Sequence, residues 1–288
     1  MLKNHYKNIY IIYLSILEIT YSMLKKKIIV LGGKGMLGNQ VTSYFKKKYK
    51  IIKINKSINR LNIKKLIYKI NNFENSIIIN CIGKIKQKKN SEKEILFSNT
   101  ILPTYLALML KKGHLLVHPS TDCVFDGKKK KIYTKQSEYS ANDIYGVSKY
   151  LADEQLKLRK NTLIIRVSII GISKNGPDLL TWALKYNNKK LYGYIDHYWN
   201  GVTTLEWCKI LEKILNKKKQ FFNSKLLQIG TKKCYSKYEI LHMIKNIFNL
   251  KFNIIKMKAG YINRCLKTDI HIKDIFEQLL ELKKYWKM

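Results

Sequence analysis

Residues 27–38 have the sequence KIIVLGGKGMLG, in which an apolar run leads directly into a glycine-rich turn. The apolar run at 27–31 predicts a buried parallel strand, and the pattern through Val41, Tyr44 and Phe45 predicts a helix. Glycines at 32, 35 and 38 permit the turn, let a pyrophosphate approach the backbone and let the helix pack close to the strand. The N–H groups at the start of that helix favour phosphate. The stretch therefore predicts a dinucleotide-binding turn.

Strands and helices alternate along the chain after this turn. Strand-like runs occur at 27–31, 50–54, 76–81, 114–119 and 162–167, and helical stretches occur near 37–48, 61–72, 94–112 and 143–159. The alternation predicts an α/β fold, a Rossmann-type doubly wound parallel sheet. Ligands bind such sheets at the carboxyl ends of the strands. Four candidate positions lie at those ends: Gly32, Asn80, Ser120 and Ser168.

We expect three regions in the 288 residues. Residues 1–22 are an N-terminal extension outside the fold, because the first strand begins soon after Met23. Residues 23–170 are the NAD(P)-binding Rossmann domain, and 171–288 are mostly a smaller substrate-binding region whose interleaving with the sheet is left open. The apolar run at 9–17 is followed by Glu18 and is shorter than the roughly 20 residues that cross a bilayer, so we expect no membrane span.

A second motif combines STDCVFDG at 120–127 with YGVSK at 145–149. Hydride transfer to a ketone builds negative charge on oxygen, so the site needs a proton donor and hydrogen bonds to that oxygen. Tyr145 and Lys149 are one helical turn apart on the same face, where the lysine cation stabilises a phenolate. Thr121 can orient the carbonyl. We therefore predict that Thr121, Tyr145 and Lys149 are catalytic.

The end of the second strand bears on the choice of cofactor. An NAD-specific site usually carries Asp or Glu there, which accepts hydrogen bonds from the ribose hydroxyls. No carboxylate occurs between Tyr49 and Leu61, whereas Lys56 and Arg60 can neutralise a 2′-phosphate. We predict that NADPH is preferred to NADH.

With both motifs in view, the chain resembles the extended short-chain dehydrogenase/reductase superfamily, and most closely the dTDP-4-dehydrorhamnose reductase-like sugar-nucleotide reductases. Further segments carry this resemblance: NCIG at 80–83, Asn99 with Pro103, RVSIIG at 166–171, GVTTLE at 201–206 and NRCL at 263–266. The resemblance implies NAD(P)H-dependent reduction of a 4-keto-6-deoxy sugar nucleotide in surface polysaccharide biosynthesis. It also implies a cytoplasmic enzyme, and a homodimer is left open.

The resemblance further implies two sets of binding residues. The cofactor site comprises Gly32, Gly35, Met36, Leu37, Gly38, Asn55, Lys56, Asn80, Cys81, Gly83 and Asn99, together with Tyr145 and Lys149. The substrate site comprises Asp122, Cys123, Val124, Phe125, Ser168 and Arg264. The sequence carries no metal-binding motif, so we expect no metal site.

Position 123 separates two reactions. Related dehydratases carry Glu directly after the Thr-Asp pair as a base, and reductases often carry Tyr, whereas this chain has Cys123. A thiol with an ordinary pKa near ~8.5 is a poor substitute for that carboxylate. We predict net reduction without dehydration. The alternatives are an epimerase or dehydratase of the same fold and a non-catalytic dinucleotide-binding regulatory subunit.

A net charge of +37 raises a further alternative, a nucleic-acid-binding protein. Nearly all of the 56 basic residues are lysines, however, whereas arginine is the residue expected at specific base and phosphate contacts. We interpret the lysines as solvated surface and predict no specific nucleic-acid partner. The five cysteines show no metal-binding spacing, so we expect them to be reduced, buried thiols.

Overall fold

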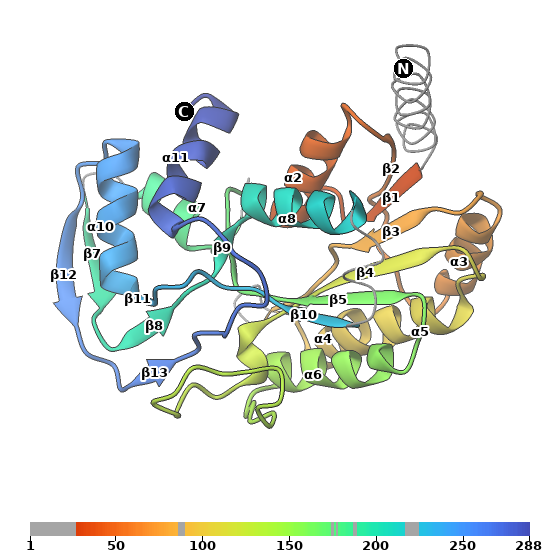
Figure 1. Cartoon of the computed structure of the whole chain (residues 1–288), viewed down its shortest axis with the longest axis horizontal. Helices are drawn as coiled ribbons and strands as arrows, with labels where there is room; N and C mark the ends of the chain where they lie inside the picture. Colours follow the sequence, from red (N-terminus) through yellow and green to blue (C-terminus); the bar gives the residue numbers. More distant parts are fainter. Residues whose placement is uncertain (1–26, 86–89, 174–175, 177, 187–188, 217–224) are drawn as a thin grey trace, which may run out of the picture.

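The computed structural model describes residues 27–85, 90–173, 176, 178–186, 189–216 and 225–288. The central sheet consists of β1 (Lys27–Leu31), β2 (Lys50–Ile54), β3 (Ile77–Asn80), β4 (Leu115–Ser120), β5 (Thr162–Arg166) and β10 (Leu226–Gln228). These six strands are all parallel and lie in the order β10-β5-β4-β3-β1-β2 (Figure 1). The predicted doubly wound parallel sheet is confirmed. The expected extension at 1–22 lies outside the described residues.

Isoleucine-rich strands fill the centre of the sheet because both of its faces are covered. In β1, Ile28 and Val30 point into one core and Ile29 and Leu31 into the other, and all four are fully buried. The chain runs from β1 outward to β2 and then back to β3 on the other side of β1. Doubly wound sheets bind ligands at such a reversal, beyond the carboxyl ends of the strands.

Helices cover the two faces of the sheet as separate layers (Figure 1). Trp207 and Leu211 pack on one face, and Leu106 and Leu156 pack on the other. The first layer consists of α2 (Met36–Phe45) and α8 (Thr204–Asn216), and the second of α3 (Ile63–Asn71), α4 (Glu92–Leu96), α5 (Leu102–Met109) and α6 (Ile144–Lys157).

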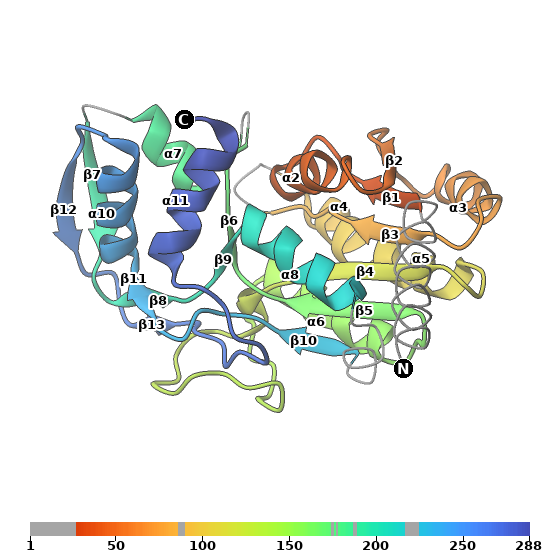
Figure 2. The ribbon, with the colours of Figure 1, turned by 45° about the horizontal axis from the view of Figure 1, so that its top comes forward.

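A second part of the molecule lies beside the carboxyl ends of the strands (Figure 2). Leu191, Ile244 and Leu279 lie in its own hydrophobic core. Its elements are α7 (Leu179–Lys185), β7 (Lys190–Tyr194), β8 (His197–Trp199), β11 (Tyr235–Ser236), α10 (Lys237–Phe248), β12 (Asn253–Met257), β13 (Ile262–Asn263) and α11 (Ile275–Trp286).

The chain passes between the two parts more than once. It leaves the sheet through β6 (Ile169–Ile170), which pairs with β9 (Val202–Thr203), and it returns through α8 and β10. The second part contains a parallel β7–β12 pair and a sheet in which β8 lies between β11 and β13. Residues 171–288 therefore contribute to both parts.

The helical stretch predicted near 94–112 is interrupted. A π-helical turn at Phe97–Ile101 separates α4 from α5. This turn directs the buried Asn99 side chain inward, where its amide accepts from the Lys84 N–H (2.9 Å) and donates to Ser148 Oγ (3.0 Å). Pro103 lies near the start of α5, where its missing N–H is tolerated.

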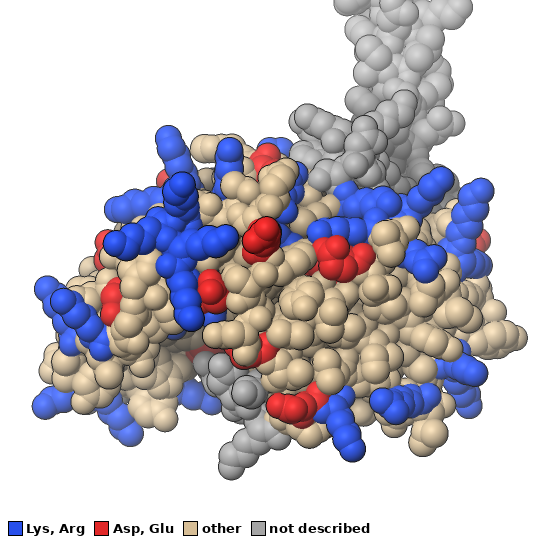
Figure 3. Space-filling view, turned by 90° about the horizontal axis from the view of Figure 1, so that it is seen from below, with Lys and Arg blue, Asp and Glu red and all other residues tan. Residues whose placement is uncertain are grey.

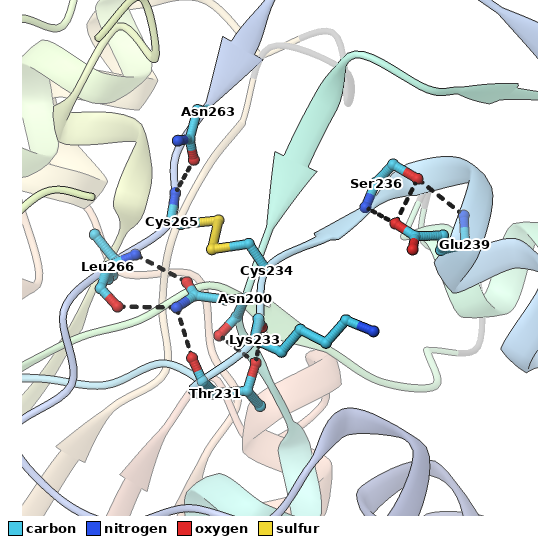
Figure 4. Close-up of a disulfide and its surroundings, with 9 residues drawn as sticks. All are labelled: Asn200, Thr231, Lys233, Cys234, Ser236, Glu239, Asn263, Cys265 and Leu266. Carbon is cyan, nitrogen blue, oxygen red and sulfur yellow. Dashed lines mark hydrogen bonds between the residues drawn. A yellow bond between two sulfur atoms is a disulfide. The ribbon is translucent and has the colours of Figure 1, made fainter. Parts of the chain in front are cut away.

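Cys234 and Cys265 form a disulfide between the segment before β11 and the segment after β13 (Figure 4). The expectation of reduced thiols is therefore wrong for this pair. Cys81, Cys123 and Cys208 are free, and only Cys208 of these three is fully buried. Cys81 and Cys123 are half-buried and line pockets, so among the free cysteines the expectation of a fully buried thiol holds only for Cys208.

Asn200 anchors the segment that follows β13, next to the disulfide (Figure 4). Its side-chain amide donates to Leu266 O and to Thr231 O (both 2.8 Å), and its oxygen accepts from the Leu266 N–H (2.9 Å). These bonds hold the backbone beside Arg264 in place.

Lysine and arginine side chains occur in several groups on the face shown in Figure 3, with acidic side chains and uncharged surface between them. The high net charge is thus not gathered into one patch on this face. Within the described ranges, no helix combines the length and the apolar character needed to cross a membrane. The apolar run at 9–17 lies outside those ranges.

Candidate active site

The glycine turn between β1 and α2 has the geometry that a dinucleotide phosphate requires. Gly32 has a φ of 74°, a conformation that favours glycine. A Cβ at position 38 would lie 2.2 Å from Gly32 O, so only glycine lets α2 approach the turn this closely. The N-cap residue is Gly35, which has no side chain to cap the helix, so the first N–H groups of α2 are available to a phosphate.

A pocket of about 640 Å³ lies beside this turn and receives the residues that follow β2. Asn55, Lys56 and Arg60 line it, so the end of β2 brings cations instead of a carboxylate. Glu94, an acid in the lining, is paired with Lys84. Two cations beside a phosphate-binding turn fit a dinucleotide that carries a 2′-phosphate. We call this the outer pocket.

A second pocket, of about 310 Å³, contains all three predicted catalytic residues. We call it the carbonyl pocket. It adjoins the outer pocket at Ile82, which lines both. Its lining includes the predicted residues Met36, Leu37, Asn80, Cys81, Gly83, Thr121, Tyr145, Lys149 and Ser168. The structure therefore brings together residues that lie up to 132 positions apart in the sequence, from Met36 to Ser168.

Close packing of α6 against the loop after β4 positions Tyr145. A Cβ at position 146 would lie 2.2 Å from Cys123 O, so Gly146 allows this approach. Asp143 caps the helix by accepting the Gly146 N–H (2.7 Å). Thr121 caps a short 3₁₀ turn, and its Oγ1 accepts the Cys123 N–H (3.2 Å). Helix and loop thus present Tyr145 and Thr121 to one pocket.

The Tyr145 phenol is protonated at neutral pH. Loss of hydration in the pocket raises its pKa above the ordinary value, and the nearby Cys123, Asp122 and Asp143 add to the rise. A hydrogen bond with Thr121 opposes the rise without cancelling it. A protonated phenol in this position is a proton donor.

Lys149 is buried, and its ammonium lies at the end of β4. Its Nζ donates to Pro119 O (2.7 Å) and lies 3.0 Å from His118 Nε2. Burial lowers the pKa of Lys149 to about 8, although Asp153 acts in the opposite direction. No hydrogen bond joins Lys149 to Tyr145 within the part of the chain that the structure describes. The direct contact implied by their helical spacing is absent from this arrangement.

A buried polar network joins β4, β5 and α6 beneath Lys149. Asp153 Oδ2 accepts from Ser120 Oγ (2.7 Å) and forms an ion pair with Arg166 (3.1 Å). On the other side, His118 Nδ1 lies 3.3 Å from Asn80 Nδ2. Burial and then the charge of Lys149 hold the pKa of His118 well below its usual range, so this imidazole is neutral.

A third pocket, of about 330 Å³, lies between the sheet and the second part of the molecule. We call it the basic pocket. It shares four lining residues with the carbonyl pocket, so the two adjoin: Asp122, Cys123, Ser168 and Ile169. The second part contributes His197, Trp199, Lys237 and Arg264. Trp199 Nε1 donates to Ser168 Oγ (2.5 Å), which ties the two parts together at this point.

Cys123 lies where the carbonyl and basic pockets meet. Arg264 Nη1 donates to its sulfur (3.4 Å), and the thiol lies 3.8 Å from Asp122 Oδ1. Burial and then Asp122 raise the pKa of Cys123 to about 12, which outweighs the opposing effect of Arg264. The thiol is neutral at pH 7 and does not act as a base.

Val124 and Phe125 do not line these pockets. Both are fully buried, and they pack with Tyr133 and Leu266 in a small core. Their apolar side chains are used for packing in this structure, so their assignment to the substrate site stays a prediction. Phe125 contributes only its backbone oxygen, which accepts from Arg264 Nε (3.0 Å).

Three residues predicted to bind cofactor are also absent from the pocket linings. Asn99 is fully buried and secures the loop at Lys84. Gly35 and Gly38 act through the backbone shape of the turn. Their assignment to the cofactor site stays a prediction.

The sequence analysis predicted Arg264 in the basic pocket but missed Lys237 and His197. Lys237 and His197 come from short strands and helices whose pattern the sequence did not resolve. One local signal exists, because Ser236 and Glu239 have capping-box spacing and place Lys237 at the start of a helix. Within the described ranges, no group of three His, Cys, Asp or Glu side chains is arranged to hold a metal ion.

Comparison with solved structures supports the fold. A dTDP-4-dehydrorhamnose reductase from Bacillus anthracis str. Ames, in complex with NADP, is 19% identical with a TM-score of 0.76, covering 92% of this chain and 100% of that one. A dTDP-glucose 4,6-dehydratase from the same organism, in complex with NAD, is 18% identical with a TM-score of 0.72, covering 91% and 96%. At these identities the likeness concerns the fold alone.

Comparison of sequences identifies the family. Spore coat polysaccharide biosynthesis protein SpsK of Bacillus subtilis (strain 168) is 29% identical over 148 residues, which are 49% of this chain and 52% of that protein. The match thus spans about half the length of this curated relative. Residues 26–255 match the family model of the RmlD substrate binding domain. Because this match covers most of the sequence, the chain belongs to the RmlD substrate binding domain family.

Proposed function

We propose that the protein is a cytoplasmic, NADPH-dependent reductase of a 4-keto-6-deoxy sugar nucleotide in the synthesis of surface polysaccharide. One observation carries the proposal: the carbonyl pocket adjoins a nucleotide-type pocket on one side and a basic pocket on the other. A reductase needs this order, because the carbonyl must lie between the nicotinamide and the rest of the substrate. Family membership supports the proposal.

The residues of the chain suit NADPH at its phosphates. The first N–H groups of α2 would bind the pyrophosphate, and Lys56 and Arg60 would bind the 2′-phosphate. The structurally similar reductase was solved in complex with NADP, which agrees with this choice. Bound NADPH supplies a hydride from its nicotinamide.

Tyr145 and Thr121 complete the reduction at the carbonyl oxygen. Reduction adds a hydride to the carbon and a proton to the oxygen. Tyr145 donates that proton, because its raised pKa keeps the phenol protonated at neutral pH. Thr121 lies in the same pocket. Its hydroxyl donates to Asp122 Oδ1 (3.0 Å) in this structure, and it would turn from this acceptor to the carbonyl to orient it by a hydrogen bond.

Lys149 supplies positive charge to the same pocket. With a pKa of about 8, it is mostly protonated at pH 7. Its contacts with Pro119 O and His118 leave a third N–H, which can donate to a ribose hydroxyl of the cofactor. Lys149 lines the same pocket as Tyr145, so its charge would favour the tyrosinate that remains after proton transfer through space, without a direct hydrogen bond.

Cys123 favours reduction over dehydration of the sugar. Dehydration requires a base that removes a proton next to the ketone. The thiol at this position is neutral, with a pKa of about 12, and its sulfur accepts a hydrogen bond from Arg264. The pocket therefore lacks the base at the position where related dehydratases carry a carboxylate.

A panel assay tests the proposal. Purified protein is incubated with NADPH and a series of 4-keto-6-deoxy sugar nucleotides, and the loss of NADPH absorbance is followed. We expect oxidation with at least one keto compound and none with the matching nucleotide hexose. Binding of NADPH without oxidation by any compound would contradict the proposal and favour a non-catalytic dinucleotide-binding protein.

A further inference from the structure

Two cations, Lys237 and Arg264, line the basic pocket beyond the carbonyl site. We propose that they bind the diphosphate of the substrate together, which makes Lys237 a substrate-binding residue. The inference rests on the proposed function, because the diphosphate is the part of a sugar nucleotide that follows the sugar. Two positive charges match the two negative charges of a diphosphate diester.

Arg264 is held rigidly and keeps donors free. Its Nε donates to Phe125 O (3.0 Å) and its Nη1 donates to Cys123 Sγ (3.4 Å). The backbone on either side is fixed, since the Asn263 N–H donates to Gly127 O (2.7 Å) and Leu266 is held by a side-chain amide. Guanidinium has five N–H donors, so further donors remain for a ligand. Among the described residues, no carboxylate forms an ion pair with Arg264.

Lys237 is the first residue of α10 and has no acidic partner in the described part of the chain. Glu239, the acid of the same helix, accepts from the Ser236 N–H (2.7 Å) and hydroxyl (2.8 Å) in the capping box. The Lys237 ammonium lies 5.5 Å from the centre of the Tyr194 ring. Loss of hydration and then the charge of Arg264 lower the pKa of Lys237. An anion that neutralises both cations would relieve this repulsion.

Two carboxylates also line the basic pocket, and each already accepts a hydrogen bond from the protein. Asp122 accepts a hydrogen bond from the Thr121 hydroxyl (3.0 Å). Asp178 caps α7 by accepting the Thr181 N–H (3.1 Å). His197 is neutral at pH 7, because loss of hydration and then Lys237 lower its pKa. Lys237 and Arg264 are therefore the side chains of this pocket that can donate charge-assisted hydrogen bonds to an anion, and Asp122 opposes the lowering of the Lys237 pKa by loss of hydration, which helps to keep its ammonium charged.

The position of the pocket identifies which phosphates fit. In a 4-keto sugar nucleotide one sugar ring separates the diphosphate from the reacting carbon, so a diphosphate site should adjoin the carbonyl pocket, as the basic pocket does. The nucleotide-type outer pocket lies on the other side of the carbonyl pocket, so the cofactor phosphates have a separate site. Trp199 and Tyr198 line the basic pocket and offer aromatic surface to the rest of the ligand.

Calorimetric titration with free nucleotides tests the site without catalysis. The probes are dTDP and UDP, with dTMP and UMP as monophosphate controls. We expect wild-type protein to bind a diphosphate at least ~10-fold more tightly than the matching monophosphate. Lys237→Met should lower the affinity for the diphosphate about 10-fold, which is the scale of one charge-assisted hydrogen bond. Lys237→Arg should keep most of the affinity. Lys256→Met removes an exposed lysine of β12 outside this pocket and should change nothing.

The variant also needs a readout that separates binding from folding and from chemistry. Lys237→Met should bind NADPH like the wild type, which shows that it folds, and should raise KM about 10-fold with little change in kcat. If the protein bound a diphosphate through Lys237 and yet oxidised no NADPH with any keto compound, that result would support the diphosphate site and contradict the proposed reductase function. Equal diphosphate affinity in wild type and Lys237→Met, or no diphosphate binding by either, would overturn the inference.

Discussion

Replacing Lys149 by Met should change how the stability of the protein depends on pH. Burial lowers the pKa of Lys149 from 10.5 to about 8, so between these values the unfolded chain holds a proton that the native protein has released. A group whose pKa is lower in the folded state makes the free energy of unfolding rise with pH across that window. From pH 7 to pH 9 the rise due to this one group is about 1.4 kcal/mol, with each pKa unit worth about 1.4 kcal/mol.

The assay compares wild type with Lys149→Met by urea or thermal unfolding at pH 7 and pH 9. Methionine keeps the apolar stem and removes the charge, so the difference between the two proteins isolates this lysine. From pH 7 to pH 9, the free energy of unfolding of the wild type should rise by about 1.4 kcal/mol more than that of the variant, which corresponds to about 4 °C in Tm. Lys256→Met controls for the loss of one positive charge. If the two proteins differed in their free energy of unfolding by the same amount at both pH values, or if the variant gained stability relative to the wild type at pH 9, a buried ammonium at Lys149 would be refuted.

Three further predictions concern the chemistry. Tyr145→Phe should lower turnover by ~100-fold or more, with folding and NADPH affinity unchanged, because only the acid is lost; retention of most activity would show that Tyr145 is not the acid. NADPH should bind more tightly than NADH in a fluorescence titration, and replacing Lys56 and Arg60 by Ala should remove the difference; equal binding by the wild type would contradict the 2′-phosphate site. Mass spectrometry of a nucleotide-linked glucose incubated with catalytic NAD should show no loss of water, because Cys123 is not a base; a dehydrated product would identify a dehydratase.

Five of the six strands of the sheet could be predicted from the sequence as short apolar runs, whereas β10 is only three residues long and was missed. Runs such as 27–31 and 162–166 stand out against lysine-rich surroundings. The residues of the carbonyl pocket follow those strands directly, so their convergence depends only on the parallel direction of the sheet. The local pattern was therefore sufficient to predict that Thr121 and Asn80 lie at the same edge of the sheet. Helical spacing was sufficient to place Tyr145 and Lys149 on one helix.

The remaining features depend on tertiary contacts that local pattern does not encode. Lys237 reaches the site because β8, β11 and β13 form a small sheet from segments far apart in the chain. The π-helical turn at Phe97–Ile101 accompanies hydrogen bonds of Asn99 to the loop at Lys84, contacts that a local helical pattern does not show. Val124 and Phe125 lie soon after Thr121, which we predict to be catalytic, but their side chains are buried in a separate core and do not line the pocket.

Isotope transfer tests the central claim, that a nicotinamide hydride reaches a sugar carbonyl with a proton from Tyr145. The enzyme is incubated with a 4-keto-6-deoxy sugar nucleotide and NADPH that carries deuterium at both C4 positions of the nicotinamide, and the product is analysed by mass spectrometry. The account predicts that each product molecule contains one deuterium on the former carbonyl carbon, that one NADPH is consumed per product, and that Tyr145→Phe forms this product far more slowly. A product without deuterium, or turnover that leaves NADPH unchanged, would contradict it.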